Sequence, residues 1–173
     1  MNRRTLLAAL FLLPLAACVV NLVFDIDKQF QVVSAAPGTV SQTQTVNLAD
    51  YQEINDHKGN IKSLDLESAD VTVTAVNAGN VASVVSGTLV LRGSGAPSDG
   101  SQDVLVGTLT NFSIRAGSTV RLPGSPALDA FLFQELQSSG QFSAILTGTV
   151  DGATDIAVDV KLHASLAYDS GIL

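Results

Sequence analysis

Two histidines, His57 and His163, are the only imidazole groups that could act as general bases for the many serines of the chain. A serine usually becomes a nucleophile by giving its proton to such a base. The sequence contains no Gly-x-Ser-x-Gly segment, which would expose the serine on a sharp turn. His163 falls on the polar face of a predicted strand and His57 in a polar loop. We therefore expect two solvated histidines, and a protein that is not an enzyme.

The aspartates are the second group that could do chemistry. Asp-Gly-x-x-Asp occurs twice, and it pairs Asp99 with Asp103 and Asp151 with Asp155. Ca²⁺ takes six to eight oxygen ligands, and neither segment matches a full calcium loop. Asp-Gly is also a strong turn signal by itself. We therefore predict turns and no metal site, and keep these four aspartates as weak calcium candidates.

Two further carboxylate pairs lie on predicted strands. Asp25 and Asp27 share one face of the first strand, and Asp155 and Asp159 share one face of the last. Paired carboxylates can exchange protons with a substrate when a cleft holds them together. Without a predicted cleft, we interpret both pairs as solvated strand faces.

The single cysteine, Cys18, has the most specific surroundings. A short basic start with Arg3 and Arg4 precedes an apolar run from Leu6 to Val20. That run of about 15 residues is shorter than the roughly 20 residues of a spanning helix, and it fits a signal peptide. The segment Leu15-Ala16-Ala17-Cys18 resembles the lipobox of bacterial lipoprotein precursors. This resemblance covers the first 18 residues only.

The lipoprotein resemblance implies cleavage between Ala17 and Cys18, which divides the chain into a signal peptide (1–17) and a lipid-anchored domain (18–173). It also implies a diacylglycerol on the Cys18 thiol and an acyl chain such as palmitate on its nitrogen, and no other cofactor. Two or more acyl chains give stable membrane anchoring. Val19, where an aspartate tends to retain lipoproteins at the inner membrane, indicates the outer membrane, with a periplasmic or surface-facing body. The Arg3-Arg4 pair also looks like a twin-arginine export signal, but we favour ordinary signal-peptide charges.

Composition limits the partners. The net charge is −7, and loss of Arg3 and Arg4 leaves seven basic against sixteen acidic residues, or −9. Such a body disfavours nucleic acid and does not bind anionic headgroups by charge, so the lipid must hold it at the membrane. One cysteine excludes an internal disulfide framework, and one cysteine with two histidines cannot fill a usual zinc site. We therefore expect the membrane and a protein of the envelope as partners.

Alternation of apolar and polar residues predicts about eight strands, and hence one mainly β domain: an antiparallel sandwich or flattened barrel. Strand 61–76 is expected to contain a bulge near Ser68 or Ala69 and to form a hairpin with strand 81–92. The first strand starts at Val20 and is expected to slip in register before Phe30. The predicted strands cover 20–32, 39–48 (a weak edge strand), 61–76, 81–92, 104–115, 119–122, 141–151 and 154–168.

One helix is predicted over residues 125–139, because Ser125 is a good N-cap, Pro126 suits the first turn and Gly140 can end it. Its apolar residues could pack on a sheet, or cover a cavity for a lipid chain. We therefore predict a non-enzymatic structural or interaction module of the envelope, with a carrier of lipids or apolar ligands as the alternative. A hydrolase with an unrecognised site ranks last. The possible ligand or partner surface consists of Leu128, Phe131, Leu132, Phe133 and Leu136.

Overall fold

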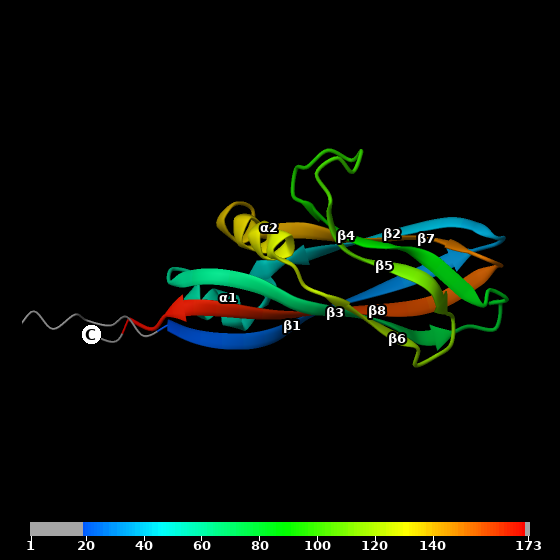
Figure 1. Cartoon of the computed structure of the whole chain (residues 1–173), viewed down its shortest axis with the longest axis horizontal. Helices are drawn as coiled ribbons and strands as arrows, with labels where there is room; N and C mark the ends of the chain where they lie inside the picture. Colours follow the sequence, from blue (N-terminus) through cyan, green and yellow to red (C-terminus); the bar gives the residue numbers. More distant parts are fainter. Residues whose placement is uncertain (1–18, 172–173) are drawn as a thin grey trace, which may run out of the picture.

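The computed structural model describes residues 19–171, which form two antiparallel sheets packed face to face (Figure 1). The predicted β-sandwich is confirmed. The first sheet has the order β1-β8-β3-β6 and the second β2-β7-β4-β5. The strands are β1 (Val19–Ser34), β2 (Gly38–Asn47), β3 (Ile61–Val76), β4 (Val84–Gly93), β5 (Val104–Ser113), β6 (Thr119–Pro123), β7 (Gln141–Val150) and β8 (Thr154–Asp169).

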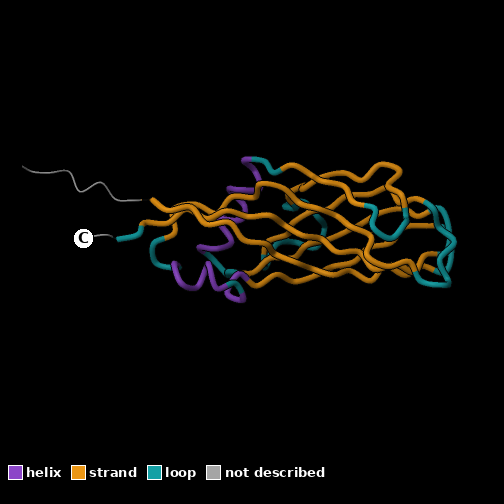
Figure 2. Tube along the Cα trace, turned by 90° about the horizontal axis from the view of Figure 1, so that it is seen from below, coloured by secondary structure: helices purple, strands orange, loops and turns teal. Residues whose placement is uncertain are grey.

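The strands run along the long axis of the molecule (Figure 2). β1 begins where β8 ends, because Val19 pairs with Asp169. The helical segments are α2 (Pro126–Gln137), the short α1 (Gln52–His57) and a 3₁₀ turn (Leu48–Asp50). At the end of the sandwich opposite the start of β1 lie four connections between strands: β1–β2, β3–β4, β5–β6 and β7–β8. No helix among the described residues is long and apolar enough to cross a membrane.

β1 alternates without the predicted slip. Ile26 and Phe30 are fully buried, and Lys28 occupies the inward position between them. Successive strand residues point to opposite faces. A charged residue at an inward position therefore makes the apolar–polar alternation look interrupted in the sequence, although the strand itself is regular. β1 is an edge strand, and an inward-pointing charge is a known protection of such edges against pairing with other chains.

β3 contains the predicted bulge. Its register against β8 shifts between Leu66 and Ser68, with two further shifts near its ends. Leu64 and Leu66 are buried before the shift, and Ala69 and Val71 after it. The shift therefore changes which parity of residue faces the core, and this places Asp70 on the outer face.

The predicted hairpin of strands 61–76 and 81–92 is wrong. β3 and β4 lie in different sheets, and each pairs with strands distant in the sequence. The Asp151-Gly152 turn likewise crosses between the sheets from β7 to β8. Local turn signals mark where the chain reverses, but they do not decide which sheet the next strand joins.

α2 begins and ends as its sequence predicts. The Ser125 side chain accepts a hydrogen bond from the Leu128 N–H, and Pro126 is the first helical residue. Gly140 adopts a φ of 68° and donates its N–H to Glu135 O at 2.7 Å. Positive φ favours glycine, so Gly140 lets the chain turn away after the last helical residue, Gln137, at little cost.

The buried hydrophobic side chains form one cluster between the sheets, and α2 contributes Leu128 and Leu132 to it. A cavity of about 20 Å³ lies among the side chains between the sheets, near Val73, Leu146 and Val158. That space holds about one water molecule and is far smaller than a lipid chain. Within the second sheet, β4 and β7 lie so close at Gly87 that a Cβ there would be 2.0 Å from the Thr147 carbonyl oxygen of β7.

Candidate functional site

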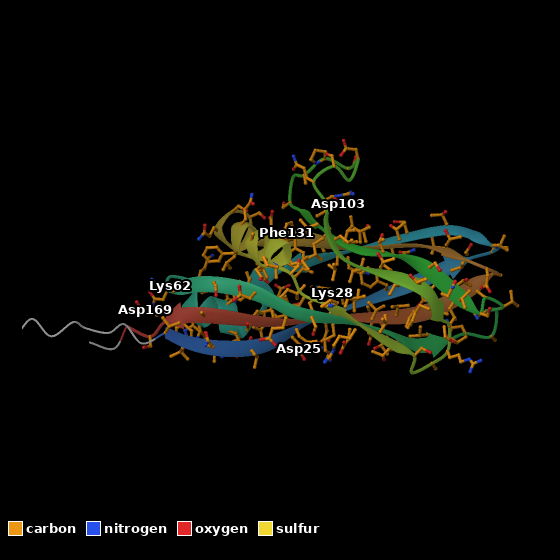
Figure 3. All side chains as sticks on the ribbon, viewed as in Figure 1. Asp25, Lys28, Lys62, Asp103, Phe131 and Asp169 are labelled. Atoms are coloured by element: carbon orange, nitrogen blue, oxygen red, sulfur yellow. The ribbon has the colours of Figure 1, made fainter. Side chains whose placement is uncertain are left out.

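A row of charged side chains crosses the outer face of the first sheet, from β1 through β8 and β3 to β6. We call Asp25, Asp70, Arg121, Lys161 and His163 the charge ladder. His163 lies opposite Asp25, and its Nδ1 is 2.7 Å from Asp25 Oδ1. Its Nε2 is 3.1 Å from Asp70 Oδ2, on the other neighbouring strand. One imidazole thus connects three strands; Figure 3 labels Asp25 on this sheet.

Two cations pair with the aspartates of the charge ladder, Arg121 from β6 and Lys161 from β8. Arg121 donates to both oxygens of Asp70, at 2.7 and 2.6 Å. Such two-point pairing fixes the guanidinium plane against the carboxylate. Lys161 lies 3.3 Å from Asp25 and 3.4 Å from Asp27. The sequence predicts that Asp25 and Asp27 lie on one face of β1, and in the structure Lys161 forms an ion pair with each of them.

These contacts shift the ionisation of the groups. The hydrogen bond from Arg121, aided by His163 and opposed by partial burial, lowers the pKa of Asp70 well below 3.8. Partial burial opposes a similar shift at Asp25, but His163 and Lys161 together lower the pKa of that carboxyl. The hydrogen bond to Asp70, opposed by burial and aided by Asp25, raises the pKa of His163 above 6.5. The site therefore favours charged aspartates and an imidazolium.

The ring contacts limit what His163 can do. A neutral imidazole donates from one nitrogen only, so donation to both carboxylates requires the protonated ring. A general base needs a nitrogen free to accept a proton, and both nitrogens face carboxylates here. Ser68 lies opposite His163 on β3, but no hydrogen bond joins its hydroxyl to the ring in the described structure. The arrangement is suited to holding strands and to responding to pH.

A shallow cleft of about 340 Å³ lies beside the ladder, lined by Val23, Glu67, Arg121 and His163 among others. Val23 is 73% exposed. His163 lies on the outer face as expected, but both of its nitrogens face carboxylates, so it is less free than a solvated histidine. His57 is half-buried, and its ring stacks on Tyr168 at 3.6 Å between centroids. Neither Asp70 nor Arg121 was expected from the sequence, because only strand pairing brings them to His163.

The weak calcium candidates all have structural partners. Asp103 pairs with Arg92 through two hydrogen bonds, and Asp99 accepts from the Ser101 N–H. No group of three or more potential metal ligands lies together among residues 19–171. The other pair is engaged at the far turns: Asp151 with Ser83 and Val84, and Asp155 with Gln31 and Asn77.

Hydrogen bonds from the Ser83 hydroxyl and from the Ser83 and Val84 N–H groups lower the pKa of Asp151 to about 2. These bonds tie the β7–β8 turn to the start of β4. Asp159, predicted to share a solvated face with Asp155, has a buried Oδ1 without a hydrogen-bond partner in the described structure. Asp151 and Asp155 therefore hold the far turns, and Asp155 and Asp159 do not form an acid–base pair.

The apolar residues of α2 divide into two sets. Leu128 and Leu132 are fully buried in the core, so the space directly beneath the helix is filled by its own side chains. Phe131, Phe133 and Leu136 are half-buried. Phe131 packs edge-on against Phe142 of β7, with ring centroids 5.8 Å apart. A larger cleft, of about 520 Å³, lies beside the helix, between α2 and the β4–β5 loop.

The predicted lipidation and cleavage positions, Ala17 and Cys18, lie outside the described residues. Val19 is the first of the described residues and the first residue of β1. Val19 is 57% exposed. The first residue of β1 therefore directly follows the predicted lipid attachment position in the sequence.

No protein-family model matches the chain, and no curated protein matches its sequence. Among solved structures, the decameric BFDV capsid protein is 12% identical, with a TM-score of 0.45, and the match covers 86% of this chain and 99% of that one. Desmodium yellow mottle tymovirus is 13% identical, with a TM-score of 0.34, over 100% and 95% of the two chains. Turnip yellow mosaic virus is 14% identical, with a TM-score of 0.31, over 87% and 97%.

Proposed function

We propose that this protein is a lipid-anchored, non-enzymatic interaction module of the bacterial envelope, held at the outer membrane through Cys18. The observation that carries the proposal is the position of β1, whose first residue follows the lipobox cysteine directly. A sandwich attached this way has no tether, so its anchored end stays next to the membrane. Its far end then presents the four turns to a partner.

The far turns support a role in binding a partner. They connect the two sheets and are held by side-chain hydrogen bonds, such as those from Asn77 and Gln31 to Asp155 at 2.7 and 2.8 Å. Surfaces that are ordered before binding lose less conformational entropy when a partner docks. The charge ladder supports a non-enzymatic role, because both nitrogens of His163 are occupied by carboxylates.

The test is Cys18→Ser in the full-length protein, expressed in bacteria and compared with the wild type by membrane fractionation and intact mass. We expect the wild type in the membrane pellet with the mass of a cleaved, acylated chain, and the variant without acyl mass. Val19→Ser is the matched control and should leave acylation unchanged. A wild-type protein without acyl mass would refute the proposal.

A further inference from the structure

The cleft between α2 and the β4–β5 loop contains a carboxylate that the charge ladder does not use. The loop stands away from the sandwich on the side of α2 (Figure 1), and Figure 3 labels Asp103 on the loop and Phe131 on the helix. The cleft measures about 520 Å³. Glu135 of α2 lines it and is 8% exposed. A pocket of this size can enclose a small ligand or a single side chain.

Glu135 has little local compensation for its charge. Ser139 Oγ donates to its Oε2 at 3.1 Å, and no Lys, Arg or His forms an ion pair with it in the described part of the chain. Arg92, at the base of the loop, is committed to Asp103. A buried carboxylate without a cation costs stability unless a charged partner arrives. Glu135 therefore indicates a cationic ligand.

The other oxygen of this carboxylate is held against the backbone. A Cβ on Gly93 would lie 2.4 Å from Glu135 Oε1, so the carboxylate packs directly on this glycine. The Arg92–Asp103 pair fixes the loop that follows Gly93. The carboxylate is thus positioned from both walls of the cleft before any ligand is present.

We propose that this cleft binds a primary ammonium group at the end of an aliphatic chain, as in a lysine-type side chain, with Glu135 as its counter-ion. An ammonium is a compact charge that can pair with one oxygen, whereas a guanidinium pairs best side-on with both, and here one oxygen is bonded to Ser139 and the other packs on Gly93. A metal ion would need several oxygen ligands, and Glu135 is the only carboxylate lining the cleft. Phe131 and Val104 line it as well and provide apolar surface for the aliphatic chain.

The experiment is an amide NMR titration of the full-length protein in a neutral detergent with Nα-acetyl-lysine methylamide, to about 20 mM, because a ligand of this size binds with a Kd of about 1 mM. The control ligand is Nα-acetyl-norleucine methylamide, which keeps the aliphatic chain but lacks the ammonium. We expect saturable shifts at Gly93–Ala96 and in α2 with the lysine compound only. Equal shifts with norleucine, or no shifts in the cleft, would overturn the proposal.

The variant test is Glu135→Gln, which keeps the shape and the acceptor for Ser139 but removes the charge. We expect at least tenfold weaker binding, and no change for Glu67→Gln on the exposed surface of β3. Gly93→Ala is the second variant, which must displace the carboxylate and should also weaken binding tenfold. Unchanged affinity in a folded Glu135→Gln protein contradicts the assignment. This proposal does not depend on lipidation, because the test uses the same protein with or without its acyl chains.

Discussion

The Nε2 atom of His163 lies 3.1 Å from Asp70 Oδ2, and this contact joins β8 to β3 across the outer face of the first sheet. The same ring reaches Asp25 on β1 with its other nitrogen. Because both contacts are strongest with a protonated ring, the protonation of His163 determines how much these contacts stabilise the pairing of the three strands. Several consequences of this arrangement and of the packing can be measured.

The charge ladder should make stability depend on pH. The pKa of His163 is raised above 6.5, so its stabilisation is complete below pH 6.5 and is lost as the pH rises through the folded-state value. The pKa values of Asp70 and Asp25 are lowered, so their stabilisation is lost as the pH falls below 3.8. The ladder thus contributes most between pH 3.8 and 6.5.

His163→Gln should remove the loss of stability that the wild type shows as the pH rises above 6.5. We expect the variant to be less stable than the wild type by about 1 kcal/mol at pH 5.5, and the difference to shrink by pH 8.5. Urea unfolding followed by circular dichroism at both pH values measures it. His57→Gln removes the other histidine and should keep the wild-type change in stability between the two pH values. A constant difference between His163→Gln and wild type would contradict the role of its protonation.

Asp70→Asn should destabilise the fold more than Asp27→Asn. Asp70 is 20% exposed and accepts from both Arg121 and His163, whereas Asp27 is 63% exposed and its ion pair is with Lys161. We expect a loss of about 1–2 kcal/mol for Asp70→Asn and under about 0.5 kcal/mol for Asp27→Asn, by urea unfolding at pH 6. Equal losses would mean that the shared carboxylate adds nothing to the ladder.

Gly87→Ala should be strongly destabilising. A Cβ at this position would lie 2.0 Å from Thr147 O and 2.5 Å from the Cα of Gly148, and backbone atoms of a central strand cannot yield cheaply. We expect a loss of about 2 kcal/mol or more in the free energy of unfolding. Gly79→Ala meets no atom within 4 Å and should change stability little. Thermal unfolding of both variants measures the effect, and the midpoint should fall for Gly87→Ala and stay near the wild-type value for Gly79→Ala.

Lys28→Leu should favour self-association. The substitution removes the inward charge between Ile26 and Phe30 on the edge strand β1 and makes its core face continuously apolar. Sedimentation velocity over a range of concentrations should show dimers or larger species that the wild type lacks. Lys62→Leu makes the same change in charge at a side chain that is 58% exposed. Association of both variants alike would point to net charge and not to the edge.

Local patterns account for the elements of this fold. The alternation in β8 and the capping residues Ser125 and Gly140 of α2 are patterns of a few neighbouring residues. Such elements can therefore be predicted from the sequence alone. Lys28 misleads such a pattern, because a long side chain can occupy an inward position and still reach water at the open edge. The apparent slip in β1 was therefore a charged residue within an unbroken strand.

The site depends on relations that no local pattern contains. Asp70 reaches the outer face only because the bulge after Leu66 changes the parity of β3. Its meeting with His163 depends further on the register between β3 and β8, which lie about ninety positions apart in the sequence. The position of Glu135 likewise depends on a distant residue, because its carboxylate packs on Gly93 at the end of β4.

β1, β3 and β8 each contain sixteen residues, so each extends roughly 50 Å at about 3.3 Å per residue. Since β1 begins and β8 ends together, the turn between β7 and β8 lies one strand length from the start of β1. Paired strands of this length behave as a rod and not as a flexible chain. If the protein is anchored at Cys18 as proposed, a partner docked on the far turns would sit at a fixed height above the start of β1, and partners whose binding surfaces lie closer or farther could not reach these turns.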